Sequence, residues 1–531
     1  MAKPDYDTLI VGAGFAGLYM LHRARALGHT ARVLEAGSGV GGTWYWNRYP
    51  GARCDVESTQ YSYQFSAELQ QQWRWTEKYA TQPEILRYIE HVADRFDLRR
   101  DIEFGACVTA ARFDETARQW EVHYERGSRL TARFLVLALG CLSSANRPEF
   151  AGLNAYQGAQ LHTGQWPERP QDFTGRRVAV IGTGSSGIQC IPMIAAQAAQ
   201  VTVFQRTANY AAPAWNQPLD DATDRSIKAD YLGLRARAKL RPTGYAFPYG
   251  ESAALAVSPE ERAAQYERFW QLGGLKFLGA FTDLMADRAA NDTAAQFVRE
   301  KIRGRVHDST VANKLLPTGV IGSKRMCVEN QYFETFNRPN VTLVDIRQSP
   351  MQRFTERGLI AGGLPHEFDT VVFATGFDAM TGSFLRINVQ GRAGKGLRDH
   401  WREQPSTYLG IAVAGFPNLF LINGPGSPSV LSNMVQSIEQ HVELIAGCLA
   451  ETQKRGAASC AVSAAVERAW GEHCQEVVAS SIRATEDSWY VGANIPGRPR
   501  VFMPYTGGVP AYLRKCAEVV SAGYSGMEFT Q

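Results

Sequence analysis

The sequence lacks long hydrophobic runs, an apolar leader and paired cysteines. No stretch approaches the roughly 20 apolar residues that span a bilayer, and the best apolar run, residues 134–142, has the length of a strand. The N-terminal residues contain no apolar signal core. Nine cysteines are scattered singly without a Cys-x-x-Cys pattern, which is typical of reduced thiols. These absences predict a soluble, cytoplasmic protein with no membrane partner.

Clustered charge of one sign is also lacking. The formal net charge is +4 over 531 residues, and the lysines and arginines are spread along the chain, which argues against a nucleic-acid partner. Apolar residues make up 45% and charged residues 20%, as in ordinary globular proteins. The length favours two or three domains. We find no pattern of metal ligands and no signal for a protein partner.

One β–turn–α–β pattern occurs twice. Residues 7–17 read DTLIVGAGFAG and residues 178–187 read VAVIGTGSSG, so that each apolar run breaks into a glycine-rich turn. The first unit continues as a predicted helix over 18–27 and a strand over 31–36. The second continues as a helix over 188–199 and a strand over 201–206. The repetition predicts two dinucleotide sites.

The first glycine turn favours FAD. Gly12, Gly14 and Gly17 form G-x-G-x-x-G between a predicted strand and a predicted helix. Gly12 permits the tight turn, Gly14 lets the backbone approach a pyrophosphate, and Gly17 allows close helix packing. Glu35 ends the second strand, where a carboxylate accepts hydrogen bonds from a ribose diol. A second glycine turn with a large aromatic residue, VGGTW at 40–44, is typical of flavoproteins. The alternative is a merely tight turn without a ligand.

The second glycine turn favours NADPH. Its glycines and the small residues between them are Gly182, Thr183, Gly184, Ser185, Ser186 and Gly187. At the position that corresponds to Glu35 the chain has the neutral Gln205, and Arg206 follows. A neutral residue does not repel a 2′-phosphate, and an arginine binds it with charge-assisted hydrogen bonds. The alternative is that Arg206 is a solvated surface residue.

We predict an α/β fold with two interlocked doubly wound, Rossmann-like domains and a helical insertion. Residues 221–315 are rich in Ala, Arg, Glu and Leu, while 369–375 and 418–423 are further predicted strands. Residues 430–531 are predicted to be mostly helical, with a Pro- and Gly-rich stretch over 491–510. The expected order is 1–145 (FAD domain, first part), 146–220 (NADPH domain, first part), 221–320 (helical insertion), 321–380 (NADPH domain, second part) and 381–531 (FAD domain, second part).

Two longer stretches are similar to the signatures of a known family. Residues 156–167 read YQGAQLHTGQWP and match aromatic-x-G-x-x-x-H-x-x-x-W-P, with Tyr156 where the family usually has Phe. Residues 41–55 read GGTWYWNRYPGARCD and match a second signature, near the flavin. On these stretches and both glycine turns, the chain resembles the type I Baeyer–Villiger monooxygenases over essentially its whole length.

The resemblance implies a reaction order. NADPH reduces FAD, O2 adds at the flavin C4a atom, and the resulting peroxyanion attacks a ketone, which becomes an ester or a lactone. The substrates would thus be a small-molecule ketone and O2. Residues 424–434 (GPGSPSVLSNM) resemble the substrate-side loop of a branch that accepts aryl, bulky or linear ketones beside small cyclic ones.

The resemblance also assigns site residues. Arg325 matches the active-site arginine, and Asp55 matches the carboxylate that holds it. Lys324, which follows Ser323, matches a ligand of the 2′-phosphate and joins Arg206 in that role. A permanent cation suits a developing oxyanion. Flavin-contacting positions are matched by Thr43, Trp44, Tyr45, Trp46, Tyr61, Val108 and Met434. Positions near NADP are matched by Arg53, Gln205 and Trp489.

Several alternatives stay open at this point. Lys324 and Arg325 also suit an ordinary basic loop, and Asp55 suits the cap of a local turn. Trp44 and Trp46 also suit plain core aromatic residues. His162 suits a hinge better than a catalytic base. A flavin-dependent N- or S-oxygenase, a peroxide-leaking reductase and a nucleotide-sensing binding protein are the rival functions. A disulfide reductase would need Cys-x4-Cys after the first turn, whereas Cys54 stands alone there.

Overall fold

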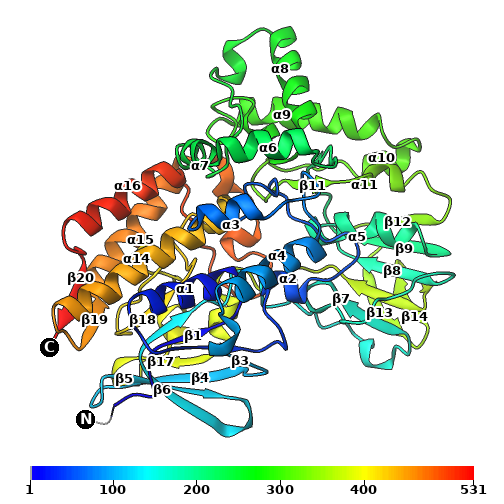
Figure 1. Cartoon of the computed structure of the whole chain (residues 1–531). Helices are drawn as coiled ribbons and strands as arrows, with labels where there is room; N and C mark the ends of the chain where they lie inside the picture. The colour runs from blue at the N-terminus through cyan, green and yellow to red at the C-terminus, as the bar shows by residue number, and fades with distance from the viewer. Residues whose placement is uncertain (1–2) are drawn as a thin grey trace.

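The chain folds around two open β-sheets that lie side by side (Figure 1). A computed structural model describes residues 3–531. The first sheet has the order β17-β4-β5-β6-β1-β2-β3, with β18 paired to β6. Its strands are β1 (Tyr6–Val11), β2 (Ala31–Glu35), β3 (Ile102–Phe104), β4 (Val108–Asp114), β5 (Gln119–Tyr124), β6 (Ser128–Leu137), β17 (Asn388–Gln390) and β18 (Leu419–Leu421).

Strand β6 joins two parts of this sheet. Its residues 128–132 pair antiparallel with β5, whereas residues 135–137 pair parallel with β18. The strands β3, β2, β1, β6 and β18 are therefore parallel neighbours, and their carboxyl ends meet at one edge. In an open parallel sheet, that edge is where nucleotides bind.

The second sheet is parallel throughout, in the order β12-β9-β8-β16-β7. Its strands are β7 (Ala159–His162), β8 (Arg177–Ile181), β9 (Gln200–Gln205), β12 (Val341–Asp345) and β16 (Thr370–Phe373). Val178 and Val180 pack into one core, and Ala179 and Ile181 into another. Burial of both faces explains why this strand reads as a continuous apolar run. The predicted α/β class with two doubly wound sheets is confirmed.

A helix follows each glycine turn directly. Helix α1 (Phe15–Ala26) begins right after Gly14, and α5 (Ser185–Ala195) right after Gly184. Both begin three residues before the predicted starts, because the glycines that break the apolar pattern still belong to the first helical turn. Neither helix has a side-chain cap, so its first N–H groups face the crevice at the strand ends.

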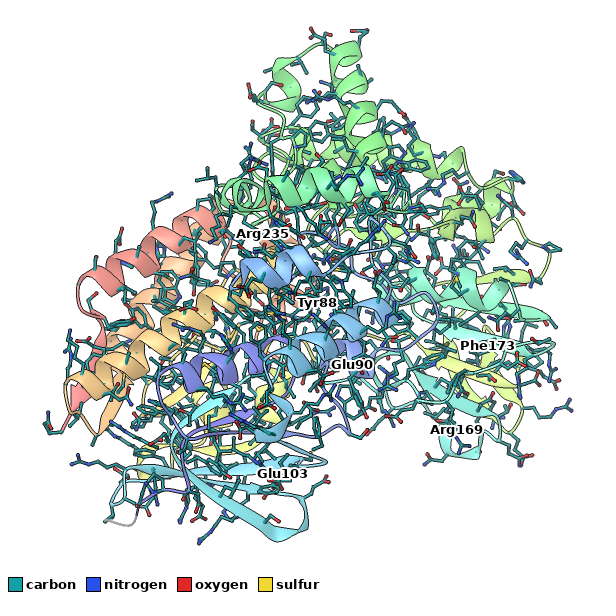
Figure 2. The ribbon with its side chains drawn as sticks, in the orientation of Figure 1. Tyr88, Glu90, Glu103, Arg169, Phe173 and Arg235 are labelled. Carbon is teal, nitrogen blue, oxygen red and sulfur yellow. The ribbon has the colours of Figure 1, made fainter. Side chains whose placement is uncertain are left out.

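The segment predicted as a helical insertion is indeed helical. It contains α6 (Asp221–Ala229), α7 (Tyr231–Lys239), α8 (Pro259–Leu272), α9 (Arg288–Arg303) and α10 (Ser309–Lys314), which form the upper part of Figure 1. Phe269 and Trp270 of α8 share one core with Val178 and Val180 of the second sheet. Arg235 of α7 lies above Tyr88 of α4 (Gln82–Arg95) in Figure 2 and donates hydrogen bonds to the segment of residues 60–70.

Some elements were not predicted. An antiparallel meander, β13 (Met351–Thr355), β14 (Gly358–Ala361) and β15 (Leu364–Glu367), covers the other face of the second sheet. The C-terminal part holds α14 (Met434–Lys454), α15 (Ala464–Ala479) and α16 (Gly508–Ser521), but also a two-stranded antiparallel sheet of β19 (Ser459–Val462) and β20 (Met527–Thr530). These two strands are far apart in sequence, so their pairing leaves no local turn signal.

Short elements complete the chain. They are α2 (Thr43–Trp46), α3 (Ala67–Gln72), α4 (Gln82–Arg95), α11 (Tyr332–Thr335), α12 (Gly382–Leu385), α13 (Leu397–His400), β10 (Ala211–Pro213) and β11 (Cys327–Glu329). Among residues 3–531, no helix has both the length and the apolar composition needed to cross a bilayer.

Candidate active site

The first glycine turn is packed against the turn at Gly41 and Gly42. At Gly12, which has φ +103°, an added Cβ would lie 2.7 Å from the carbonyl oxygen of Ala138, and at Gly17 it would collide with the backbone of Gly12. Gly14 differs, because its φ of −82° suits any residue. An added Cβ there would lie 3.3 Å from the Cα atom of Gly42. Gly14 is therefore explained by close approach, not by backbone conformation.

Glu35 lies at the end of β2, beside this turn. One carboxylate oxygen accepts a hydrogen bond from the Ala13 N–H (2.6 Å) and the other from the Gly37 N–H (2.7 Å). Burial raises the pKa of Glu35 even though these N–H groups favour the ionised form. The carboxylate thus fixes the glycine turn, and each oxygen keeps a lone pair that a ribose diol can use. This arrangement fits FAD.

The predicted flavin contacts fall into two kinds. Trp44 is buried and donates a hydrogen bond from its indole N–H to Tyr61 (3.3 Å), so its interpretation as a core residue is correct. For Trp46 that interpretation is wrong, since its side chain is 36% exposed. Tyr45 is buried and donates its hydroxyl to Glu168 (2.7 Å). Of the other predicted contacts, Thr43 is exposed, Val108 is buried at the start of β4, and Met434 begins α14.

The second glycine turn leaves open space where the first does not. An added Cβ would collide with the backbone of Ala374 at Gly182 and with that of Gly182 at Gly187. At Gly184 it would meet no protein atom within 4 Å, although the φ of −79° suits any residue. Neither packing nor conformation explains glycine at this position. The open space at a helix N-terminus fits a dinucleotide phosphate.

Small side chains fasten this turn to its neighbours. The Thr183 hydroxyl donates to the carbonyl of Thr207 (3.1 Å), and the Ser185 hydroxyl lies 3.4 Å from the Cys327 sulfur atom. Ser186 is half-buried on α5. Cys327 begins β11, two residues after Arg325. The turn is thereby held beside the segment that carries the predicted cations.

The residues predicted to choose NADPH lie close together. Gln205 is buried and donates its amide to the Lys314 carbonyl (2.7 Å), while Arg206 is exposed. Burial lowers the pKa of Lys324, and the guanidinium of Arg206 lowers it further. The Arg206 guanidinium therefore acts on Lys324 through space. The Ser323 hydroxyl donates to the carbonyl of Val320 (2.8 Å), which fixes the loop that carries Lys324.

Arg325 and Asp55 form a two-pronged ion pair. Arg325 Nε lies 2.5 Å from Asp55 Oδ2, and Nη2 lies 2.9 Å from Oδ1, while Nη1 donates to the carbonyl of Val430. Burial alone would lower the pKa of Arg325, but the facing carboxylate raises it above its ordinary value. The side chain of Arg325 is 20% exposed and that of Asp55 23% exposed, so part of each stays accessible to solvent. The alternative of an ordinary basic loop does not explain this fork.

Segment 41–55 connects the two nucleotide units. Gly42 contacts Gly14 of the first turn, and the Tyr49 hydroxyl donates to Gln189 of α5 (2.8 Å) behind the second turn. Asp55, at the end of the segment, holds Arg325. The Trp46 carbonyl also accepts from the Trp166 N–H (3.1 Å). One continuous segment therefore positions both turns and the predicted catalytic cation, Arg325.

Two residues predicted near NADP have partners in the protein. Arg53 forms an ion pair with Glu77 (3.2 Å) and donates to the carbonyl of Tyr79. Trp489 stacks obliquely on Tyr490, with ring centroids 4.2 Å apart, and packs with Met434 against the same apolar cluster. Sequence reasoning missed Tyr490, which is buried and has a pKa raised to about 12 by burial, with the Arg325 cation acting in the opposite direction. The predicted substrate-side loop 424–434 includes Val430, but its contact with Arg325 was missed, because only the backbone carbonyl takes part and leaves no side-chain signal.

His162 connects the segments that run between the sheets. Its Nδ1 accepts a hydrogen bond from the Gly164 N–H (2.9 Å), and its Nε2 faces the Asn146 carbonyl (3.1 Å) and the Thr375 hydroxyl (3.2 Å). Burial lowers its pKa, which keeps the ring neutral. Trp166 of the same signature packs near Phe173, labelled in Figure 2, at a ring distance of 6.3 Å. These contacts suit a structural junction better than a catalytic base.

The cysteines form neither a disulfide nor a metal site among the described residues. Across residues 3–531, all nine are free thiols, and no group of three His, Cys, Asp or Glu side chains could hold a metal ion. Cys54, next to Asp55, is buried, and burial raises the pKa of its thiol. A thiol in that state is a poor nucleophile.

Comparison with known proteins identifies the family. A family model described as pyridine nucleotide-disulphide oxidoreductase matches residues 9–228, which include both glycine turns. A Baeyer-Villiger monooxygenase of Pseudooceanicola batsensis is 41% identical over 527 residues, covering 98% of this chain and 96% of that protein. The chain belongs to the Baeyer–Villiger monooxygenase family. The predicted resemblance is thereby confirmed.

Other relatives of the family extend the comparison. A phenazine N-monooxygenase of Lysobacter antibioticus is 39% identical and covers 99% of this chain and 97% of its own length. A structure of oxidized steroid monooxygenase bound to NADP is 51% identical, with a TM-score of 0.95 and 99% of both chains covered. A complex of the protein OTEMO with FAD and NADP is 36% identical, with a TM-score of 0.96 over the whole of both chains.

Proposed function

We propose that the chain is an FAD-containing, NADPH-dependent monooxygenase that inserts one oxygen atom of O2 beside a ketone carbonyl and forms an ester or a lactone. The observation that carries the proposal is the partly exposed Arg325–Asp55 fork. It lies near the second glycine turn, because Cys327, two residues after Arg325, contacts Ser185. FAD, when bound, accepts hydride from NADPH and activates O2. The protein contributes binding, orientation and charge.

The geometry supports a proposed role for each of these residues. Gly14 and Glu35 hold FAD at the first turn, while Gly184, Arg206 and Lys324 hold NADPH at the second. Arg325 keeps its positive charge at every working pH and stabilises the negative charge that develops on oxygen during attack. Asp55 accepts hydrogen bonds from two of the guanidinium N–H groups and so fixes the plane of the cation.

We also propose the division into domains. Residues 1–145 and 381–531 form the FAD domain, 146–220 and 321–380 the NADPH domain, and 221–320 the helical insertion. The proposal is supported by the strand order of the two sheets. Strands β17 and β18, within residues 381–531, belong to the first sheet, while β12 and β16, within residues 321–380, belong to the second. A cytoplasmic location is proposed because all nine cysteines, each within the described residues, are free thiols.

The substrate is proposed to be an aryl, bulky or linear ketone, with small cyclic ketones also accepted. The loop 424–434 supports this, since Val430 within it accepts a hydrogen bond from Arg325 and Met434 ends it. N-oxygenation of an aromatic N-heterocycle is a second candidate, favoured by the 39% identity to a phenazine N-monooxygenase. The same cofactor sites serve both reactions.

The test is a panel of ketones and N-heterocycles assayed with NADPH and O2 by product analysis. Ester or lactone formation coupled to NADPH consumption is the expected result. Product analysis is needed because uncoupled NADPH oxidation, with peroxide as its product, mimics turnover. If only N-oxides form across the panel, the proposed reaction is wrong although both cofactor sites stand.

A further inference from the structure

Two neighbouring strands of the second sheet end beside the predicted NADPH site. Strands β9 and β12 are parallel, and their register places Asp345 opposite Gln205. Arg206 and Thr207 follow Gln205, just as Arg347 follows Asp345 by two residues. Because parallel strands end at the same edge, the two segments leave the sheet side by side.

Arg347 contacts the Arg206 segment directly. Its Nη2 donates a hydrogen bond to the Thr207 hydroxyl (3.0 Å), and its backbone N–H donates to Asp345 (2.9 Å). The Thr207 carbonyl accepts from the Thr183 hydroxyl of the glycine turn. Arg347 is therefore fixed beside the turn and beside Arg206, and its other N–H groups remain available to a ligand.

None of the three cations in this neighbourhood is paired with a carboxylate among the described residues. Within the described residues, no carboxylate lies within 4.0 Å of the charged nitrogens of Arg206, Lys324 or Arg347. Arg206 and Arg347 both act to lower the pKa of Lys324, against Glu486 and Asp487, which act to raise it. Glu486 itself interacts with Arg288 and the Val320 N–H. Three cations without a paired carboxylate suit an anion with more than one charge.

We infer that Arg347 is a third cation for the 2′-phosphate of NADPH, beside Arg206 and Lys324, and contributes to the choice of NADPH over NADH. The inference rests on the proposed function, which assigns NADPH to this site. Arg347 has no signal in the sequence, because only the pairing of β9 with β12 brings it to Thr207. Its planar guanidinium donates to Thr207 and to a phosphate oxygen at the same time.

The test measures binding to the FAD-loaded enzyme by calorimetry, with 2′,5′-ADP and 5′-AMP as probes that differ in the 2′-phosphate. Arg347→Ala should weaken 2′,5′-ADP binding about five- to tenfold, as expected for an exposed charge-assisted contact, and leave 5′-AMP unchanged. Arg347→Lys should keep most of the affinity as a point charge. Arg353→Ala, on exposed β13, is the control with the same change of charge.

Equal 2′,5′-ADP affinities for Arg347→Ala and Arg353→Ala would overturn the inference. In that case, if Arg206→Ala loses affinity for 2′,5′-ADP but not for 5′-AMP, the proposed use of NADPH stays intact. If the wild-type enzyme does not distinguish 2′,5′-ADP from 5′-AMP, both the inference and the proposed choice of NADPH fail.

Discussion

At the scale of single residues, the two nucleotide turns differ in why they need glycine. Gly12, Gly17, Gly182 and Gly187 are explained by collisions that a Cβ would make with the backbone. Gly184 is not, because its conformation is ordinary and the space around it is free of protein atoms. A glycine that neither packing nor backbone conformation explains is therefore a sensitive position at which to test for a bound ligand.

Gly184→Ala should therefore leave the melting temperature and the FAD content unchanged. It should raise the KM for NADPH about tenfold or more, because the methyl group occupies the place where the backbone approaches the phosphates. Steady-state kinetics and differential scanning calorimetry on one preparation separate these effects. A lowered melting temperature together with an unchanged KM would contradict the assignment.

Arg325→Ala should abolish ester formation while FAD stays bound and is still reduced by NADPH. Loss of one preorganised donor at a developing oxyanion costs about 10²–10³ in rate. Stopped-flow absorbance with product analysis should show reduction of the flavin and hydrogen peroxide in place of the ester. Arg325→Lys should rescue poorly, because a point charge does not reproduce the fork on Asp55. Near wild-type ester formation in Arg325→Ala would make the residue a bystander.

The lowered pKa of Lys324 predicts a pH dependence. At neutral pH the ammonium group is protonated and binds the 2′-phosphate; as the pH rises through the lowered pKa, the charge is lost. We expect kcat/KM for NADPH to fall at a pH below the ordinary lysine range, while kcat/KM for NADH does not respond. Lys324→Arg, which stays charged, should remove this fall. Its persistence in that variant would assign the titration to another group.

At the scale of elements, His441 connects α14 to two other segments. Its Nδ1 accepts from the Asn423 N–H (2.9 Å), and its Nε2 lies 2.7 Å from the Tyr512 hydroxyl of α16. The Tyr512 hydroxyl donates to the Leu409 carbonyl (2.6 Å), so that His441 donates to Tyr512 as a neutral ring. Burial lowers the pKa of His441 to about 3.

This burial predicts a loss of stability in acid. The unfolded state protonates His441 below a pH of about 6.5 while the folded state does not, so the free energy of unfolding falls as the pH drops from there toward 3. One pH unit below the unfolded pKa the loss is about 1.4 kcal/mol. Denaturant unfolding at pH 7.5 and at pH 5.5 measures the free energy of unfolding. Between these two pH values it should drop by about this amount more in the wild type than in His441→Gln. Equal drops would contradict the argument.

At the scale of the whole molecule, the helical insertion is fastened to the FAD part by a buried cation. Arg235 is only 4% exposed and donates to the Gln60 carbonyl, the Ser62 hydroxyl and the Gln70 amide oxygen. Burial lowers its pKa, and the chain offsets that cost with these acceptors. Removal of the guanidinium leaves the Gln70 amide oxygen without a partner, whereas the Gln60 carbonyl keeps Asn433 and the Ser62 hydroxyl keeps Thr59.

Arg235→Met should destabilise the docking of the insertion by about 3 kcal/mol, given three lost hydrogen bonds to a charged donor. Limited proteolysis with thermolysin should then cut within residues 221–256 faster than in wild type. Arg237→Met, on the same helix, removes an exposed ion pair with Asp230 and should change little. Equal cleavage rates for the two variants would show that Arg235 does not fasten the insertion.

The sequence by itself determined the class of fold, the two nucleotide turns and the family, because these depend on local patterns. A strand that breaks into G-x-G-x-x-G and a helix leaves its signal within about 30 residues. The long signatures at 41–55 and 156–167 carried the family assignment, which the full-length relatives confirm. The assignment of roles to residues such as Met434 or Trp489 stays a prediction.

Only the tertiary structure decided which distant residues meet. Asp55 reaches Arg325 because segment 41–55 crosses from one nucleotide unit to the other, and Val430 joins them through a backbone carbonyl. Arg347 reaches Thr207 only through the pairing of β12 with β9. Such contacts depend on strand order and long-range packing, which no local periodicity records. For this protein, local pattern therefore indicated which cofactors bind, and long-range packing set the geometry around them.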